Sequence, residues 1–320
     1  MTRDELRRRL GGTINETSLG AIGAPRRGKV RDIYDRGSEL FFVTTDRVSA
    51  FDRVITTIPF KGFVLTSTAA FWFERTRAIA PNHLLDVPHP NVMRVRKLRP
   101  LDVEMVVRAY ITGVTSTSLW THYSAGRRVI AGHTLPEGLR KNERLREPLI
   151  TPSTKAAVGL HDETVSPADL IRAGVVSEQT YEELARLSLA LFAFGTARCA
   201  GRGVILVDTK YEFGLDEQGK ITLMDEIHTP DSSRFWDAAS YEAALRRGED
   251  PAGFDKEYVR RWLKGAGFGG DGKVPDVPDE VRAEAGMRYI EAYEKITGMR
   301  FEPPYADAMA SLAEWAAGKT

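Results

Sequence analysis

The amino-acid sequence predicts an α+β protein, and three observations support this class. Two long strand-like runs, residues 91–98 and 101–111, follow each other directly, which favours antiparallel pairing over βαβ units. Two further runs, at 203–214 and 220–227, flank the turn-forming residues Leu-Asp-Glu-Gln-Gly and predict a hairpin. The chain beyond about residue 250 has helical composition. Strands and helices that are segregated along the chain are typical of the α+β class.

We expect this order to divide the chain into three regions. A β-rich N-terminal domain covers residues 1–110, an α+β domain covers 111–250, and a helical C-terminal extension covers 251–320 and packs on the core. With 320 residues, 42% of them apolar, the chain has enough material for a sizeable core. The composition is that of a globular protein rather than a fibrous or disordered one.

The charge balance and the single cysteine limit the partners and the compartment. Lys and Arg number 45 against 44 Asp and Glu, so no global charge predicts binding to nucleic acid or to an anionic membrane. Cys199 alone can form neither an intrachain disulfide nor a C-x-x-C zinc site, which favours a reducing compartment. The first ten residues lack the apolar segment of a signal peptide, and the most apolar stretch, 187–197, is too short to cross a bilayer. We therefore expect a cytoplasmic protein, in which a local cluster of cations could still bind a small phosphorylated ligand. A monomer is expected.

The N-terminal third predicts strands with one helix between them. The strand-like runs are rich in β-branched and aromatic residues and are bounded by turn residues. The helical run ends before Pro81, which cannot continue a helix. The predicted strands cover 39–45, 53–59, 91–98 and 101–111, and the predicted helix covers 65–80.

The middle third predicts a long loop followed by a helix. Residues 124–168 are rich in Gly, Pro, Thr and charge, and a loop of this length in a compact domain usually carries function. A capping box, Thr180-x-x-Glu183, predicts the start of a helix whose apolar residues recur at helical spacing until Gly201. Cys199, near the end of that helix, is expected to pack as a small buried thiol without chemistry.

The last third predicts a helix between clear start and stop signals. Pro278 and Asp279 stand at its start and Gly298 at its end. The Gly- and Pro-rich residues 265–278 before it predict a flexible connector.

The hairpin carries the most informative cluster of charges. A two-residue turn at 217–218 would place Lys210 opposite Asp225, with Asp208 and Glu212 on the same sheet face. Facing water, this pattern is a solvated, salt-bridged strand. The near-continuous apolar run GVILVD favours burial instead. Buried acids need partners, and Mg²⁺ held by one or two carboxylates and by nucleotide phosphates would provide one.

A second candidate is the segment GKVRDIYD. Gly28 lets the backbone approach a ligand closely, and Lys29 and Arg31 would point the same way from a strand. Two parallel cations beside a glycine suit nucleotide phosphates. A basic edge strand has the same pattern. The segment is neither a Walker A loop nor a Rossmann fingerprint.

Further cations follow in the second half of the chain. Arg108 closes the apolar run VEMVVR, where a buried guanidinium needs an anion or a carboxylate. Ser232, Ser233 and Arg234 are expected in one turn, where hydroxyls, backbone N–H groups and an arginine could bind a phosphate. An Asp–Ser helix cap with a surface arginine is the alternative interpretation.

The loop at 124–168 contains two more polar motifs, LITPSTKA and HDETVS. Lys155 could bind an acidic substrate, whereas His161, Asp162 and Glu163 could simply form turns and caps. Neither a G-x-S-x-G elbow nor an H-E-x-x-H helix occurs in the sequence, so serine-hydrolase and zincin chemistry have no support.

Taken together, these segments resemble the SAICAR synthetase (phosphoribosylaminoimidazole-succinocarboxamide synthase) family, in its longer, yeast-like form. The resemblance covers about residues 25–240. It rests on GKVRDIYD, TTDRVSAFD, VEMVVRAYITG, ITPSTKA with HDE, VDTKYEFG and MDEIHTPDSSRFWD, in that order. It implies an ATP- and Mg²⁺-dependent ligase that joins L-aspartate to the ribotide CAIR in purine biosynthesis, through an acyl phosphate. It also implies a nucleotide-binding α+β fold distantly similar to protein kinases and ATP-grasp enzymes.

The resemblance also implies roles for individual residues. The nucleotide site would comprise Gly28, Lys29, Arg31, Glu104, Lys210 and Asp225. The residues expected to carry the phosphoryl-transfer chemistry are Lys29, Arg31, Lys210, Glu212 and Asp225, of which Glu212 and Asp225 would hold Mg²⁺. The substrate contacts would be Arg108, Ser233 and Arg234 on the ribotide 5′-phosphate, Asp231 near the imidazole, and Ser49 and Lys155 on the aspartate side.

One position departs from the family pattern. Family members often have Ser directly after the Gly of the R-x-x-x-x-G segment, where it helps to hold the ribotide phosphate. Here Val114 follows Gly113, so Thr115 or Ser116 would have to supply the hydroxyl, or Arg234 would carry more of the binding.

Two other functions stay open from the sequence. A small-molecule kinase could use the same ATP site on a hydroxyl acceptor, although no H-R-D-x-x-x-x-N loop is present. A non-catalytic nucleotide-binding module is the second, and the joint presence of Lys29, Glu212, Asp225 and Arg234 argues against it.

Overall fold

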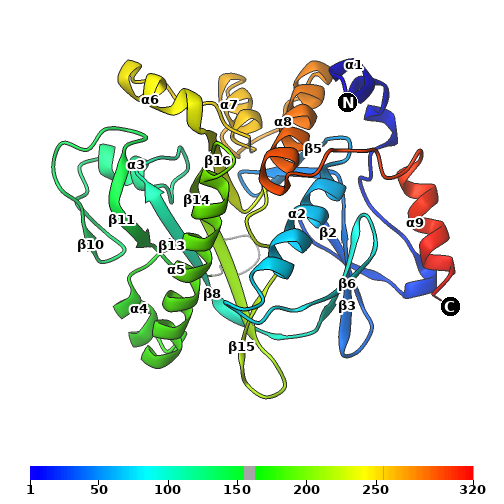
Figure 1. Ribbon diagram of the computed structural model, residues 1–320, viewed down its shortest axis with the longest axis horizontal. Helices are drawn as coiled ribbons and strands as arrows, with labels where there is room; N and C mark the ends of the chain where they lie inside the picture. Colours follow the sequence, from blue (N-terminus) through cyan, green and yellow to red (C-terminus); the bar gives the residue numbers. More distant parts are fainter. Residues whose placement is uncertain (155–162, 255, 320) are drawn as a thin grey trace.

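The structure is a computed structural model that describes residues 1–154, 163–254 and 256–319, and its strands form two main antiparallel sheets (Figure 1). The first sheet has the spatial order β1 (Pro25–Arg27), β2 (Arg31–Asp35), β3 (Glu39–Thr44), β7 (Val92–Arg96), β6 (Leu84–His89). The second has the order β13 (Glu163–Thr164), β12 (Ser153–Thr154), β8 (Arg99–Tyr110), β14 (Val204–Leu215), β15 (Ile221–Met224), with β11 (Arg144–Ile150) paired to β8 and β16 (Ser233–Asp237) to β14. Two small hairpins pair β4 (Arg47–Ala50) with β5 (Arg53–Thr57) and β9 (Val129–Ile130) with β10 (His133–Thr134).

Helices surround both sheets. In chain order they are α1 (Arg3–Arg8), α2 (Lys61–Arg75), α3 (Leu119–Ser124), α4 (Pro167–Arg172), α5 (Glu178–Ala200), α6 (Ala238–Arg247), α7 (Glu257–Gly265), α8 (Asp279–Thr297) and α9 (Ala308–Ala317), with 3₁₀ turns at Leu10–Gly12 and Gly20–Ile22. The antiparallel α+β class expected from the sequence is confirmed. No helix of the described chain is long and apolar enough to span a bilayer.

The chain passes from the first sheet to the second between β7 and β8, and this differs from the expected domain boundary. The first sheet ends with β7 at Arg96, whereas β8 begins at Arg99 and pairs with β14. A boundary at residue 110 would therefore cut β8 from its own sheet. One apolar core runs through both halves, because Trp72 and Phe73 of α2 belong to the same buried cluster as the inner residues of β8, β14 and α5.

Helix α5 packs on one face of β14 and β8 (Figure 1). Its cap is Ser177, whose hydroxyl accepts a hydrogen bond from the Thr180 N–H at 3.1 Å. The helix therefore begins at Glu178, before the Thr180 box that we expected to open it. Its apolar stripe is buried as predicted, and Cys199 is 1% exposed, so burial raises the pKa of that thiol to about 12. A protonated, buried thiol fits a packing role.

The hairpin of β14 and β15 has a longer turn than we expected. Asp216 and Lys220 close the loop through an N–H to carbonyl bond of 3.1 Å, and Glu212 lies opposite Met224. The predicted two-residue turn would have placed Glu212 opposite Leu223, so the register is shifted by one residue. The predicted pairing of Lys210 with Asp225 across the ladder is therefore wrong, because β15 ends at Met224.

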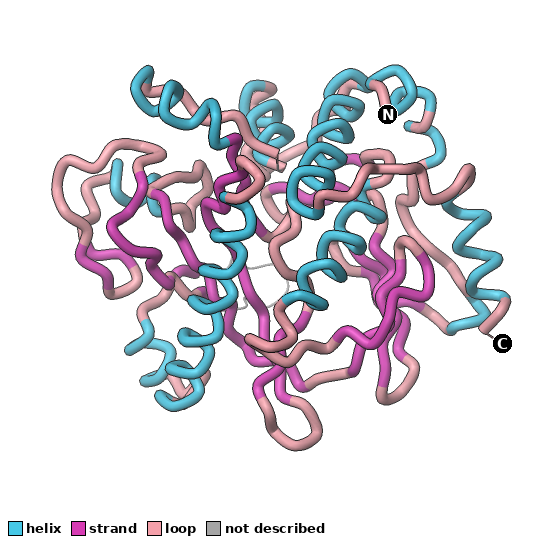
Figure 2. The backbone as a smooth tube through the Cα atoms, viewed as in Figure 1, coloured by secondary structure: helices cyan, strands magenta, loops and turns pink. Residues whose placement is uncertain are grey.

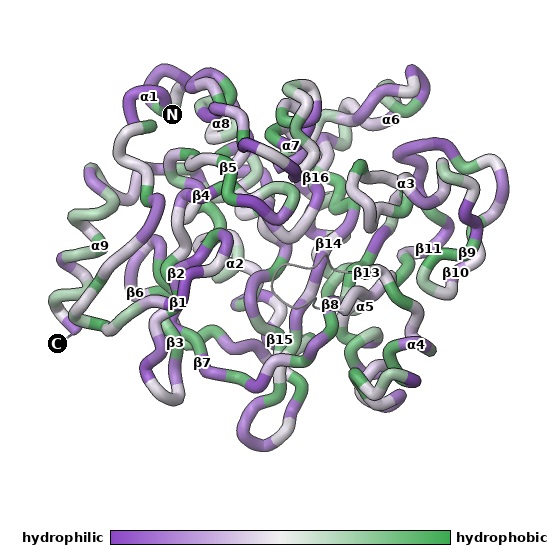
Figure 3. Tube along the Cα trace, turned by 180° about the vertical axis from the view of Figure 1, so that it is seen from behind, coloured by the Kyte–Doolittle hydropathy of each residue, from purple (hydrophilic) through white to green (hydrophobic). Residues whose placement is uncertain are grey.

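Helices α8 and α9 pack against the N-terminal part of the molecule, which contains the first sheet (Figure 2). Pro278 and Gly298, which is in the left-handed conformation with φ 78°, bound α8 as predicted. This helix packs on α1 and α2, while α9 places Leu312 against the first sheet. Helix α1 is hydrophilic apart from Leu6 (Figure 3), which it buries against α8.

Candidate functional site

The site is built on the outer face of β8 and β14. Their antiparallel register places Glu104 opposite Glu212 and Arg108 opposite Asp208. Because side chains alternate along a strand, Asp208, Lys210 and Glu212 share one face, as the sequence predicted. The neighbouring odd-numbered residues point inward and form the core.

Lys210 lies between two carboxylates on this face. Its ammonium donates to Glu104 at 2.8 Å and also contacts Glu212. Burial favours the neutral amine, but Glu212 and Glu104 outweigh it and raise the pKa of Lys210 well above its ordinary value. Lys210 is therefore a fixed positive charge, and Glu104, expected in the nucleotide site, lies beside it.

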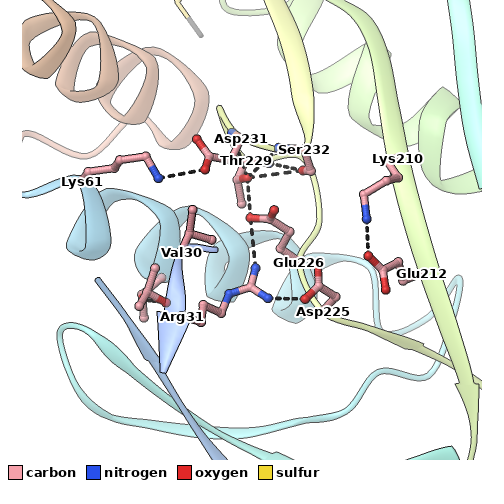
Figure 4. Close-up of polar contacts among 12 residues, drawn as sticks. Val30, Arg31, Lys61, Lys210, Glu212, Asp225, Glu226, Thr229, Asp231 and Ser232 are labelled. Carbon is pink, nitrogen blue, oxygen red and sulfur yellow. Dashed lines mark hydrogen bonds and ion pairs between the residues drawn. The ribbon is translucent and has the colours of Figure 1, made fainter. Parts of the chain in front are cut away.

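Asp225 lies near this cluster because its own backbone is left-handed, and not because it pairs in the ladder of β14 and β15. It follows the last residue of β15 and has φ 67°, an uncommon conformation for a residue other than glycine. Its carboxylate is paired with the guanidinium of Arg31, which also lies 3.3 Å from Glu226 (Figure 4). Burial lowers the pKa of Arg31, but Asp225 and Glu226 more than compensate and raise it. Burial likewise raises the pKa of Glu226.

The segment from Gly28 to Arg31 is not one strand. Strand β2 begins at Arg31, which is buried, while Lys29 lies in the preceding loop, is largely exposed and pairs with Asp52 at 2.5 Å. The expectation that Lys29 and Arg31 point the same way is therefore wrong. Arg47 holds this loop, because its guanidinium donates to the carbonyls of Gly28 at 3.0 Å and Lys29 at 3.1 Å.

Arg108 and Arg234 converge on one carboxylate. The Asp208 carboxylate accepts from Arg234 at 2.5 Å and lies 3.7 Å from Arg108, and Glu257 lies 3.8 Å from Arg234. The expected need of buried Arg108 for an anion is met by Asp208. Burial, together with the nearby charge of Arg234, still lowers the pKa of Arg108 to about 10.

Ser233 does not share this position. Ser233 and Arg234 are consecutive residues of β16, not members of a turn, so their side chains leave opposite faces of the strand. The Ser233 hydroxyl donates to Thr209 at 2.7 Å and is buried. The prediction that both contact the same phosphate is therefore not supported by this arrangement.

The loop after β8 packs directly against Arg234. A Cβ on Gly113, which has φ 103°, would lie 2.3 Å from the Ser118 hydroxyl and 3.1 Å from the Arg234 guanidinium, so only glycine fits. Thr115 makes a 2.8 Å hydrogen bond with the Ser118 hydroxyl. The Val114 carbonyl accepts from Lys264 of α7 at 2.7 Å.

Asp231 lies in a third group, at the end of the loop that follows β15. Its carboxylate accepts from the ammonium of Lys61 at 2.8 Å and from the hydroxyl of Tyr289 at 2.6 Å. Thr229 and Ser232 form the turn beside it, with the Thr229 N–H donating to the Ser232 hydroxyl at 3.1 Å (Figure 4).

The residues that we missed are Lys61, Tyr289, Glu226 and Arg47. Their partners lie in distant segments, which the sequence does not indicate. Asp208 was expected on the face of Lys210, but its pairing with Arg234 was not. Ser49 lies half-buried in β4, and no described hydrogen bond joins its side chain to the other candidate residues. Lys155, His161 and Asp162 lie outside the described residues.

Comparison with known proteins identifies the family of this chain. The family model of SAICAR synthetase matches residues 25–277. A putative phosphoribosylaminoimidazole-succinocarboxamide synthase 2 from Mesorhizobium japonicum is 48% identical over 292 residues, covering 91% of this chain and 93% of that protein. The phosphoribosylaminoimidazole-succinocarboxamide synthase of Legionella pneumophila strain Lens is 46% identical over 289 residues, with 90% and 92% covered.

Solved structures show the same relationship. The SAICAR synthase from Saccharomyces cerevisiae, complexed with SAICAR, superposes with a TM-score of 0.78 at 33% identity, covering 91% of this chain and all of that one. A type-2 SAICAR synthetase in complex with ADP gives a TM-score of 0.67 at 25% identity, covering 87% of this chain. The chain therefore belongs to the SAICAR synthetase family, the ATP-dependent ligases of this step in purine biosynthesis.

Proposed function

We propose that this protein joins L-aspartate to CAIR with consumption of ATP, and that the outer face of β8 and β14 carries the reaction. The observation that best supports the proposal is the arrangement along that face. A carboxylate–lysine cluster lies at one end (Glu104, Lys210, Glu212), and two arginines that share one acid lie at the other (Arg108, Arg234). One end suits a nucleotide with its metal, and the other suits a terminal phosphate.

The chemistry requires activation of a carboxylate. The γ-phosphoryl group of ATP passes to a carboxylate oxygen of CAIR, which gives ADP and an acyl phosphate. The amine of aspartate attacks the acyl carbon, the new C–N bond forms, and the C–O bond to phosphate breaks as phosphate leaves. The amine loses its proton in this step. Positioning and charge neutralisation supply most of the catalysis in phosphoryl transfer.

At the nucleotide end, we assign phosphate contacts to Lys29, Arg31 and Lys210, with Gly28 and Glu104 beside them. Within the described chain, no group of three or more His, Cys, Asp or Glu side chains is arranged to hold a metal ion. Two acids nevertheless suit Mg²⁺, which is usually held by one or two carboxylates together with phosphates and water. Glu212 and Asp225 would hold the ion, which would neutralise charge on the ATP phosphates.

At the ribotide end, we assign the 5′-phosphate to Arg108 and Arg234. A phosphate between them would compete with Asp208 and Glu257 for the same guanidinium groups. Thr115 lies in the loop that packs on Arg234, so its hydroxyl is a candidate replacement for the serine absent at Val114. The buried pairing of the Ser233 hydroxyl with Thr209 makes Ser233 a weaker candidate than we expected.

Asp231 is assigned to the imidazole. CAIR carries an exocyclic amine, and an ionised carboxylate accepts hydrogen bonds from such a group. Ser49 and Lys155 remain predictions for the aspartate side, as do a monomeric state and a cytoplasmic location. The yeast protein solved with SAICAR and the type-2 protein solved with ADP are consistent with a ribotide site and a nucleotide site in one chain.

The test is ADP release measured with each substrate omitted in turn. We expect release to require both CAIR and aspartate, and the product to be an amide that contains aspartate. ADP release with a phosphate ester as product would favour the small-molecule kinase. Nucleotide binding without turnover under any substrate combination would favour the non-catalytic module.

A further inference from the structure

The carboxylate of Asp231 is held by two distant segments of the chain. Lys61, the first residue of α2, donates to one oxygen at 2.8 Å, and Tyr289 of α8 donates to the other at 2.6 Å. Figure 4 shows the Lys61 side chain extended toward Asp231. Lys61 is fully buried, Tyr289 is 1% exposed, and the ammonium of Lys61 also lies 5.5 Å from the centre of the Tyr289 ring.

The charges around Asp231 favour its ionised form. Burial alone would raise the pKa of Asp231, but Lys61 and Lys256, which precedes α7, hold it below its ordinary value, together with the hydrogen bonds from Lys61 and Tyr289. Glu226, on the same loop, opposes them as a nearby acid. A buried carboxylate with two donors still has free lone pairs, so Asp231 can accept a further hydrogen bond from a ligand.

Within the proposed function, we propose that Tyr289 and Lys61 are positioning residues that hold the Asp231 carboxylate ionised and oriented for the amine of CAIR. The C-terminal helix α8 then contributes to substrate recognition without touching the substrate. The inference depends on the assignment of Asp231 to the imidazole, and it would give the C-terminal extension a part in the site rather than only in the core.

A purely structural role for Tyr289 is the competing explanation, and α8 supplies a matched control. Tyr293 lies one helical turn further along, is 6% exposed and packs against Phe63 and Phe301. Its hydroxyl is not a partner of Asp231 in the structure. Tyr289→Phe and Tyr293→Phe each remove one hydroxyl from the same buried helix face, and only the first removes a bond to Asp231.

The experiment compares steady-state kinetics and thermal melts of the full-length wild type, Tyr289→Phe, Tyr293→Phe and Lys61→Met. We expect Tyr289→Phe to raise the KM for CAIR by about 10-fold, the lower end of the range for losing one hydrogen bond to a charged group, with the KM for ATP unchanged. Tyr293→Phe should keep the wild-type KM for CAIR. In Lys61→Met, the pKa of Asp231 rises, so the acidic limb of kcat/KM for CAIR should move to higher pH.

Equal KM values for CAIR in the two tyrosine variants would overturn the inference. A loss in Tyr289→Phe that affects ATP, aspartate and CAIR alike, with a lowered Tm, would also overturn it, because that is the result of a structural defect. If Lys61→Met does not fold, the two tyrosine variants decide the question. Failure of the proposed function is distinguishable, since wild-type protein would then release no ADP in response to CAIR and aspartate.

Discussion

The ion pairs of the candidate site are of two kinds, those within the second sheet and those between the two halves of the molecule. Lys210 pairs with Glu104 and Glu212, and Arg234 with Asp208, all from strands of one sheet. Strand alternation and register determine these contacts, so they form wherever β8, β14 and β16 form. They are local consequences of the sheet.

The second kind joins segments that only the tertiary fold brings together. Arg31 of the first sheet pairs with Asp225, and Lys61 of α2 pairs with Asp231, both on the loop after β15. The main chain joins the same parts, because Leu223 of β15 donates to the Pro81 carbonyl at 2.9 Å and accepts from His83 at 3.0 Å. The second sheet therefore supplies a fixed surface, while the contact between the halves orients the loop that carries Asp225 and Asp231.

We expect the largest effect from two variants, each of which removes one acid. One acid belongs to an ion pair within the second sheet and the other to an ion pair between the two halves. Asp225→Asn and Glu212→Gln should each lower kcat by about 10²–10³, the usual cost of losing one electrostatic stabiliser of a transition state. Only Asp225→Asn removes a partner of buried Arg31, so it should also lower Tm more than Glu212→Gln does. The measurements are kcat across a Mg²⁺ titration and thermal melts.

Asp86→Asn is the control for these variants, because Asp86 pairs with Arg94 at the surface of the first sheet. It should keep the wild-type kcat. Near wild-type kcat at ordinary Mg²⁺ in both folded test variants would contradict the metal assignment.

The next effect concerns a pair within the sheet. Arg234→Ala removes a charge-assisted fork from the ribotide end, so kcat/KM for CAIR should fall about 10- to 150-fold, the value of one hydrogen bond to a charged group. The KM for ATP should change far less. Arg186→Ala, which removes an exposed arginine paired with Glu183 on α5, is the control. Normal CAIR kinetics in Arg234→Ala would remove this residue from the site.

The third prediction concerns His228, which lies on the loop that also carries Asp225 and Asp231. His228 is fully buried and hydrogen-bonded to the Tyr211 hydroxyl at 2.5 Å, and burial lowers its pKa from 6.5 to about 3. The unfolded chain therefore binds the proton more tightly, and the contribution of this residue to stability is lost as pH falls below 6.5. The expected loss is about 2 kcal/mol between pH 7.5 and pH 5.

His228→Gln carries no titrating ring, so its free energy of unfolding should fall less over the same interval, whatever its stability at pH 7.5. Urea unfolding at the two pH values measures the difference. The same pH-dependent loss in variant and wild type would show that His228 is not the group responsible.

The smallest expected effect concerns Cys199, which belongs to neither kind of ion pair. Cys199→Ala should keep full activity and lower the free energy of unfolding by about 1 kcal/mol, because it removes one small buried group behind the second sheet. Activity and urea unfolding check this. Lost turnover in the folded variant would reveal thiol chemistry that the structure does not suggest.

The same division explains what the sequence could predict. The shared face of Asp208, Lys210 and Glu212 followed from alternation alone, and the burial of Arg108 followed from the apolar run VEMVVR. The position of Asp225 did not, because a longer turn shifted the register and a left-handed residue then returned the carboxylate to the cluster. The closeness of Asp225 to the cluster was thus expected for a reason that proved wrong.

The sequence could not predict the contacts between the two halves, and the reason is a different one. Lys61 stands in the run PFKGFV and shows no periodic or motif signal, since its partner Asp231 lies far away in the sequence. Ser233 and Arg234 were misplaced because a Ser- and Asp-rich segment predicts a turn, whereas pairing with β14 makes it a strand. Tertiary pairing overrides local preference at both places.

The antiparallel register of β8 and β14 has a consequence for the length of the ligand. Glu104 and Arg108 are four residues apart on one strand, so the two ends of the site are separated by about 13 Å. The sheet would therefore select a ligand by its length as well as by its charge. Under the proposed function, an imidazole carboxylate without its ribose phosphate would lack the group that binds Arg108 and Arg234. Inserting two residues into β8 between Glu104 and Arg108 would move one of these residues by about 7 Å relative to its partner on β14.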